Sequence, residues 1–247
     1  MILIAILLGA LGLADLARAG KVLGRAALLL ATTVGVAWLA LTAWGVGVSW
    51  WWVFAGAAVV ALWVWTTDAA LTSRRALPWP IIGLALVLVA ILAAGRDAPT
   101  PGGLAVDWYA NLAIVSLESV PFELFAVGLG CVLFLLESAN IVVRIVLAAA
   151  EARPVEQRTT DAPKASESDM VKGGRILGPI ERLFIFTMTL AGQPLAIAAV
   201  IAAKSILRYP EVSKDSDGSK AEYVLVGSFV SWSVALTLVL LLWNGTA

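Results

Sequence analysis

The sequence predicts an all-α fold, a polytopic bundle of seven or eight transmembrane helices, and composition is the first observation behind this prediction. Hydrophobic residues make up 61% of the 247 residues and charged residues only 14%, against about 45–50% and about 25% in soluble domains. The mean hydropathy is +0.93. A water-soluble chain of this length could not bury so much apolar surface, so we expect lipid to surround most of it.

The second observation is a series of continuous apolar runs, each near the length that crosses about 30 Å of hydrocarbon. The six clear runs are residues 2–17, 26–44, 50–67, 77–94, 122–149 and 223–243. The first run resembles a signal peptide, but no basic residue precedes it, so we expect an uncleaved helix. Residues 95–107 are rich in proline and glycine and predict turns. We expect residues 108–120 to lie along the outer surface.

The third observation is the placement of basic residues, which predicts the orientation. They follow the first, third and fifth runs, whereas the loops after the second and fourth runs contain only Arg96. By the positive-inside rule, the loops rich in Lys and Arg face the cytoplasm and the N-terminus lies outside. We expect the eleven tryptophans to anchor helix ends at the membrane surfaces, with Trp63, Trp65 and Trp79 toward the inner one.

One long hydrophilic stretch, residues 151–175, divides the chain. It is rich in Glu, Arg, Asp, Lys and Ser, a composition that cannot bury a core and predicts a flexible cytoplasmic linker. Before it lies an N-terminal transmembrane block of five helices, residues 1–150. After it lies a C-terminal transmembrane block, residues 176–247.

The residue inventory also narrows the chemistry. Histidine is absent and Cys131 is the only cysteine, which excludes histidine-based catalysis, a disulfide within the chain and every multi-cysteine metal site. Lys and Arg together number 17, as do Asp and Glu, so no net charge attracts nucleic acid. Asp15 is expected to pair with Arg18, one turn further along the helix. We therefore expect no cofactor, no metal and no enzymatic activity.

The fifth run carries a polar stripe. Glu123, Gly130, Glu137, Arg144 and Glu151 recur every seven residues, with Asn140 three residues after Glu137. Seven residues are close to two helical turns, so one continuous helix would place them near one face. This face must meet protein or water, because charged groups at depth are costly. Two interpretations remain open: a polar seam that holds helices together, which we favour, and a cation-binding carboxylate at Glu137.

The C-terminal block permits two topologies. Residues 183–203 could form one span, which would place the basic residues from Lys204 onward outside. Alternatively, the stretch breaks at Gly192-Gln193-Pro194 and forms a hairpin of two short helices, about residues 176–192 and 194–209. The hairpin agrees better with the charge rule and is preferred. It brings Glu181 and Lys204 to similar depth, where they could pair, and it places Arg182 and Arg208 at the headgroup level.

Four motifs in fixed order resemble one family. They are SANIVVR at residues 138–144, GGRILGPIER at 173–182, AAKSILRY at 202–209 and AEYVLVG at 221–227. The region of about residues 130–235 resembles an uncharacterised family of bacterial integral membrane proteins, a domain of unknown function. Ser138 stands where the family pattern has proline. The resemblance implies the bacterial cytoplasmic (inner) membrane and attaches no activity to the motifs.

Two functions follow as hypotheses. The first is a non-enzymatic membrane component, such as a scaffold, assembly factor or sensing subunit, that contacts membrane lipid and a protein partner at the cytoplasmic face. The charged residues expected at that face are Arg175, Glu181, Arg182, Lys204, Arg208 and Glu222. The alternative is a small transporter or channel that uses Glu137, Asn140 and the helix break near Gln193.

Overall fold

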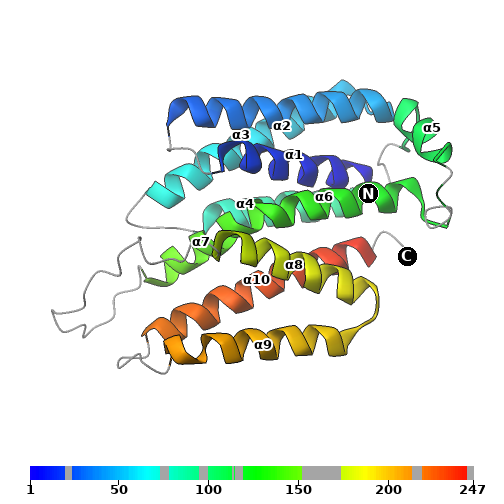
Figure 1. Ribbon diagram of the computed structural model, residues 1–247. Coiled ribbons are helices and arrows are strands. Elements are labelled where there is room, and N and C mark those ends of the chain that lie inside the picture. The colour runs from blue at the N-terminus through cyan, green and yellow to red at the C-terminus, as the bar shows by residue number, and fades with distance from the viewer. Residues whose placement is uncertain are drawn as a thin grey trace.

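The computed structural model describes residues 1–19, 24–72, 78–94, 100–112, 114, 119–151, 174–212 and 219–243. Within these ranges the chain forms ten helices and no strand (Figure 1). The helices are α1 (Ile2–Arg18), α2 (Arg25–Val46), α3 (Trp50–Thr72), α4 (Trp79–Ala93), α5 (Leu104–Ala110), α6 (Phe122–Leu136), α7 (Ser138–Glu151), α8 (Gly174–Leu190), α9 (Pro194–Val212) and α10 (Ser219–Trp243). Each apolar run predicted from the sequence coincides with a helix or a helix pair. The linker of the prediction lies almost entirely outside the described residues.

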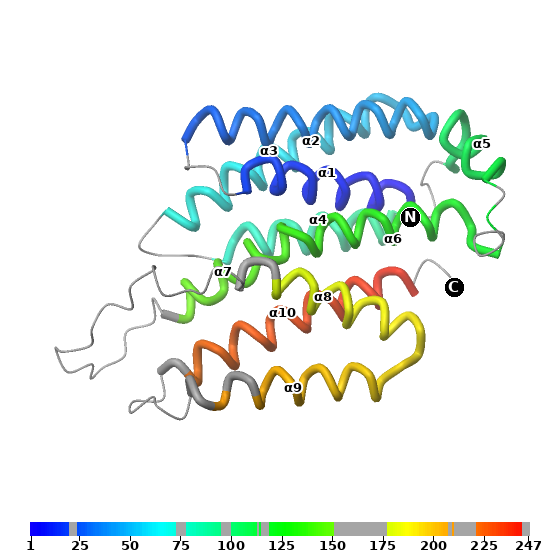
Figure 2. The backbone as a smooth tube through the Cα atoms, viewed as in Figure 1, coloured from blue at the N-terminus to red at the C-terminus, as the bar shows by residue number. Residues whose placement is uncertain are grey.

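Helix α1 is the centre of the bundle. Thirteen of its 17 residues are buried. Helices α2, α3 and α6 surround it (Figure 2). Glycines bring the α1 and α6 backbones together: a Cβ added at Gly12 would lie 2.5 Å from the Leu133 carbonyl oxygen, and one at Gly130 would lie 2.6 Å from that of Ala5. Gly12 and Gly130 therefore permit the close packing of the two helices.

The C-terminal helices form a second layer. Helices α8 and α10 pack against each other and against α6 and α7, while α9 packs on α8 at the edge of the bundle (Figure 2). The chain reverses between α8 and α9 at Gly192, whose φ of 67° is left-handed and favours glycine. Pro194 then opens α9. The predicted hairpin, with its break at Gly192-Gln193-Pro194, is therefore present.

The sequence predicted one continuous helix for the fifth apolar run, but the structure has two. Helix α6 ends at Leu136 and α7 begins at Ser138, with a bend of 48° between them. Glu137, at the junction, has φ −131° and ψ −40°, outside the helical region. The bend overturns the idea that the stripe from Glu123 to Glu151 follows one straight helix face.

Three helices, α2, α3 and α10, are long and apolar enough to cross a membrane, and α6 with α7 would make a fourth. This is fewer than the seven or eight spans predicted. Among the other described helices, α4 has 15 residues and α1 and α8 have 17 each, short of a full crossing without tilt. Large apolar side chains cover the exterior, including Trp51 of α3, Leu86 of α4 and Leu240 of α10. Such a surface is consistent with a membrane protein.

Candidate functional site

Buried polar groups form three sets of hydrogen-bonded residues, two of which include residues of the α6–α7 junction. The Asp15 cluster consists of Asp15, Arg18, Trp63, Thr67 and Ser138. The Arg182 cluster consists of Glu137, Asn140, Arg182 and Ser231, with the carbonyl of Leu135. The Glu181 clasp consists of Glu181, Lys204 and Trp232.

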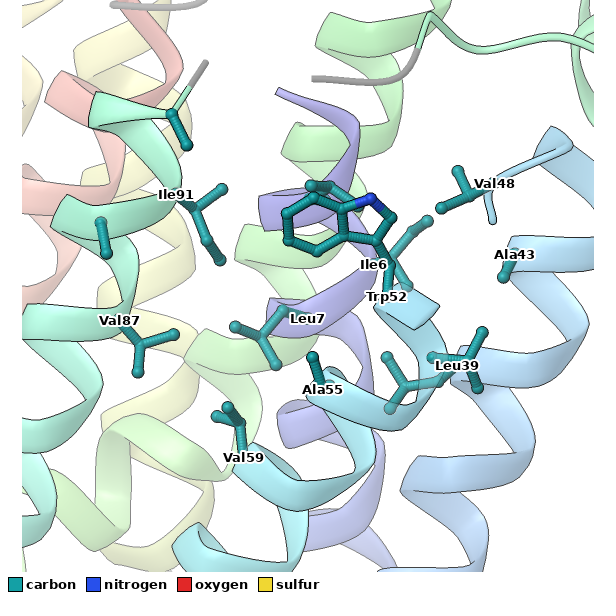
Figure 3. A pocket seen from close by; sticks show the side chains of 15 residues that line it. Ile6, Leu7, Leu39, Ala43, Val48, Trp52, Ala55, Val59, Val87 and Ile91 are labelled. Carbon is teal, nitrogen blue, oxygen red and sulfur yellow. The ribbon is translucent and has the colours of Figure 1, made fainter. Parts of the chain in front are cut away.

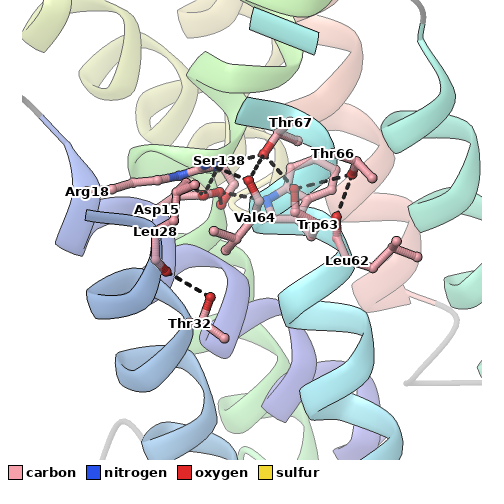
Figure 4. Close-up of polar contacts among 10 residues, drawn as sticks. All are labelled: Asp15, Arg18, Leu28, Thr32, Leu62, Trp63, Val64, Thr66, Thr67 and Ser138. Carbon is pink, nitrogen blue, oxygen red and sulfur yellow. Dashed lines mark hydrogen bonds and ion pairs between the residues drawn. The ribbon is translucent and has the colours of Figure 1, made fainter. Parts of the chain in front are cut away.

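The carboxylate of Asp15 is fully buried and accepts two hydrogen bonds on each oxygen (Figure 4). Oδ1 accepts from Nε and Nη2 of Arg18, at 2.9 and 2.6 Å. Oδ2 accepts from Nε1 of Trp63 at 3.0 Å and from Oγ of Ser138 at 2.5 Å. The predicted pair of Asp15 and Arg18 is confirmed. These bonds join α1 to α3 and α7, and four donors offset the desolvation of the carboxylate.

Arg18 extends the Asp15 cluster along α3. Its Nη1 donates to the carbonyl oxygen of Val64 at 3.0 Å, and its Nη2 donates to Oγ1 of Thr67 at 2.7 Å. The Thr67 hydroxyl in turn donates to the carbonyl oxygen of Trp63 at 2.6 Å. The ion pair is thus bound into the backbone of a neighbouring helix and not only to its own.

The guanidinium of Arg182 is the centre of the second cluster. This side chain is only 2% exposed and donates to three different helical segments. Nε donates to the carbonyl oxygen of Leu135 at 3.2 Å, Nη1 to Oγ of Ser231 at 3.2 Å, and Nη2 to Oδ1 of Asn140. The amide of Asn140 donates to Oε2 of Glu137 at 3.1 Å. A buried arginine needs this many acceptors, because unpaired donors in an apolar setting are costly.

The Arg182 cluster accounts for the bend at Glu137. In a continuous helix the carbonyl of Leu135 would accept from the backbone N–H four residues further on. Here the carbonyl accepts from Arg182 instead. The backbone N–H of Asn140 donates to the backbone carbonyl oxygen of Glu137 at 2.9 Å, which makes a tighter turn. Side chains therefore satisfy backbone groups that the break releases, which is one of the recognised causes of a kink.

The Glu181 clasp joins the three C-terminal helices. Oε2 of Glu181 lies 2.5 Å from Nζ of Lys204, and Oε1 accepts from Nε1 of Trp232 at 2.8 Å. Nζ of Lys204 also lies 5.5 Å from the centre of the Trp232 ring, within range of a cation–π contact. The pairing of Glu181 with Lys204 across the hairpin, predicted from their similar distances to the turn, is confirmed.

Five of the nine predicted site residues come together in these clusters: Glu137, Asn140, Glu181, Arg182 and Lys204. Arg182 was expected at the headgroup level and is buried inside the protein instead. Arg144 on α7 and Glu222 near the start of α10 are exposed and stand apart. Arg175 lies in the first turn of α8 and Arg208 in α9, but their side chains lie outside the described part of the chain.

The Asp15 cluster was largely missed by sequence reasoning. Trp63, expected to anchor at the inner surface, is only 3% exposed and donates to Asp15. Thr67 and Ser138, the other members from α3 and α7, are fully buried. The only sequence signal was the spacing of Asp15 and Arg18, which suggests an ion pair but does not identify partners on other helices.

Beside α1 lies a cavity of about 340 Å³, lined by apolar side chains of α1, α2, α3 and α4 (Figure 3). The polar clusters do not line it. In the described ranges no group of three His, Cys, Asp or Glu residues is placed to hold a metal ion. Cys131 is buried in α6.

The arrangement as a whole joins seven helices by buried charge, with α7 contributing to two clusters through Ser138 and Asn140. Comparison with protein-family models, with curated proteins and with solved structures finds no match for this chain.

Proposed function

We propose that the protein is a multi-pass component of a bacterial cytoplasmic membrane that acts without enzymatic chemistry, as a scaffold, assembly or sensing subunit. One observation carries the proposal: the buried charged groups are bonded to neighbouring helices. Arg182 donates hydrogen bonds to α6, α7 and α10, and Asp15 accepts hydrogen bonds from α1, α3 and α7. Charges used in this way hold helices in fixed positions.

The proposed topology has eight crossings, made by α1, α2, α3, α4, the pair α6 and α7, α8, α9 and α10, with the N-terminus outside. The antiparallel hairpin of α8 and α9 supports the eighth crossing. The start of α1 and the end of α10 lie at one end of the bundle (Figure 1). The end of α1 and the start of α2, whose terminal residues are Arg18 and Arg25, lie toward the other end. Such a separation fits the positive-inside rule.

Cysteine accessibility in a Cys131→Ser background tests the topology. Ser49→Cys, in the exposed turn between α2 and α3, is expected to react with an impermeant thiol reagent added outside. Ser213→Cys, beyond the end of α9, is expected to react only after the inner face is opened. Labelling of Ser213→Cys from outside would favour seven crossings and contradict the eight-crossing topology.

The partner surface is proposed to be the cytoplasmic end, where Arg144 and Glu222 are exposed. A protein partner that co-purifies in mild detergent should be lost on charge reversal, in Arg144→Glu or Glu222→Lys. Glu123→Lys, in the first turn of α6 at the proposed outer end of the bundle, is the matched control and should retain the partner. Equal retention by all three variants, or a chain that purifies alone from native membranes, would contradict a cytoplasmic partner.

The bend at Glu137 favours a second candidate, a small transporter or channel, because interrupted helices and intramembrane carboxylates are typical of such proteins. We favour the scaffold since the Arg182 cluster fills the space at the bend with protein contacts. Flux of protons or small cations into liposomes that disappears in Glu137→Gln would reverse this preference. Assignment of residues 130–235 to the uncharacterised bacterial membrane family likewise stays a proposal.

A further inference from the structure

The cavity among the first four helices has a buried floor and an exposed rim. Leu3 and Leu7 of α1 and Leu39 of α2 form the floor, and all three are buried. Ala55 of α3 and Ala90 of α4 also line it and are exposed. Small side chains on both walls leave an opening between α3 and α4, so the cavity is continuous with the outer apolar surface.

The two walls of the cavity match each other in length. On α3 the lining extends from Trp52 to Val59 (Figure 3). On α4 and its C-cap residue it extends from Val87 to Ala94. Each wall covers seven residue steps, or about 10 Å along the helix. The cavity is therefore a slot that runs along the helices, shaped for a thin, extended apolar group.

The chemistry of the slot excludes water as a stable occupant. A water molecule in a cavity needs two to four polar partners, and apolar side chains form the lining. An empty cavity lowers stability in proportion to its volume, and this one has about 340 Å³. In a membrane, lipid acyl chains are the apolar groups that surround the helices in greatest excess, and they are the expected occupant.

One polar group stands at the rim of the slot. Trp52 lines it and is partly exposed, and in the described residues no acceptor is bonded to its indole N–H. Trp50 and Trp51, at the same end of α3, are exposed, as expected for residues at the membrane–water interface. An indole N–H at that depth is placed to donate to an ester carbonyl, the polar group from which a lipid acyl chain extends.

We propose that this slot binds one acyl chain of a bilayer phospholipid, with its ester end at Trp52 and its methyl end toward Leu7 and Val59. The proposal rests on the proposed membrane location and adds a specific lipid site to it. It also assigns a role to the cavity that α1 and α4 both line: the lipid chain completes the packing of the N-terminal helices.

The test uses the full chain in phosphatidylglycerol vesicles that contain a phospholipid with a photoreactive diazirine midway along one acyl chain. After illumination, the cross-linked residues are mapped by mass spectrometry. We expect adducts on the buried floor residues Leu3 and Leu7, which lipid around the bundle cannot reach. Adducts on exposed Leu86 are expected as well, because it faces bulk lipid in any membrane-embedded arrangement.

Two variants on α4 separate the slot from the rest of the surface. Ala90→Trp fills the slot and should abolish the adducts on Leu3 and Leu7 while keeping those on Leu86. Ala85→Trp makes the same change at an exposed position outside the slot and should retain all three. Unchanged thermal unfolding in detergent verifies that both variants are folded.

The outcomes are distinct. Adducts on Leu86 without adducts on Leu3 and Leu7 in the unmodified chain would overturn the lipid site and leave the membrane location intact. Absence of adducts on Leu86 as well would overturn both. Floor adducts from a diazirine fatty acid but not from the phospholipid would overturn the proposed source of the chain, and floor adducts that persist in Ala90→Trp would overturn the assignment to this slot.

Discussion

The two halves of the bundle are held together by different forces. Around α1, packing depends on apolar contact and on glycines that bring backbones together, with one polar cluster at the far end of the helix. Around α8, it depends on buried charges: Arg182 reaches three segments, and Glu181 joins α9 and α10. The comparison teaches that short helices rich in charge can join an apolar bundle when each charge has partners on its neighbours.

The largest effect is expected from removing the charge at the centre of the second half. Arg182→Met leaves the Leu135 carbonyl, the Asn140 side chain and Ser231 without their donor. Breaking a buried charged network in this way costs about 3–5 kcal/mol. Chemical unfolding in mild detergent measures the loss. Arg182→Lys keeps the charge without the planar donor geometry, so its free energy of unfolding should lie between those of Arg182→Met and the unmodified chain. Equal stability of Arg182→Met and the unmodified chain would contradict the role of the cluster.

The next largest effect tests the single polar cluster of the first half. Asp15→Leu leaves Arg18 without its carboxylate and removes an acceptor from Trp63 and Ser138. We expect a loss of about 2–3 kcal/mol, smaller than for Arg182→Met because Arg18 keeps its bonds to α3. The double variant Asp15→Leu with Arg18→Leu should recover part of the loss. Strict additivity of the two changes would argue against the pairing.

A smaller effect is expected where the backbones of α1 and α6 meet. Gly12→Ala places a methyl group within 2.5 Å of the Leu133 backbone, and the resulting overpacking costs about 1–3 kcal/mol. Gly83→Ala is the matched control, since nothing lies within 4 Å of a Cβ added there. The difference in unfolding free energy between the two variants isolates the contact. Equal stabilities would show that the helices separate without cost.

The smallest effect is expected at the edge of the bundle. Lys204 is partly exposed, with a side-chain relative accessibility of 16%, so its pair with Glu181 should contribute about 1 kcal/mol or less. A double-mutant cycle of Lys204→Met and Glu181→Met measures the coupling free energy directly. A coupling indistinguishable from zero would restrict the charged packing of the second half to Arg182 alone.

Local sequence signals predicted the helices and the hairpin well. Apolar runs mark where helices form, and Gly192-Gln193-Pro194 marks a turn whichever neighbours surround it. The similar distances of Glu181 and Lys204 from that turn, 12 and 11 residues from Gln193, predicted that they pair. These features depend on chemistry within a few residues, or on the simple antiparallel geometry of one hairpin.

Other features depend on contacts between distant segments and could not be predicted in the same way. The bend at Glu137 depends on Arg182, 45 residues further along the chain, which occupies a carbonyl that a straight helix would use. Trp63 is buried because Asp15 accepts its indole N–H; its sequence environment is the same as that of a surface anchor. The hydroxyl of Ser138 donates to Asp15, 123 positions away in the sequence.

Two side chains separated by a single residue, Ser138 and Asn140, reach in different directions into the two clusters. The first turn of α7 therefore connects the two halves of the protein. A force that tilts α7 against α1 must strain the bonds to Arg182 as well, so the halves respond to such a force as one body until one of the two clusters opens.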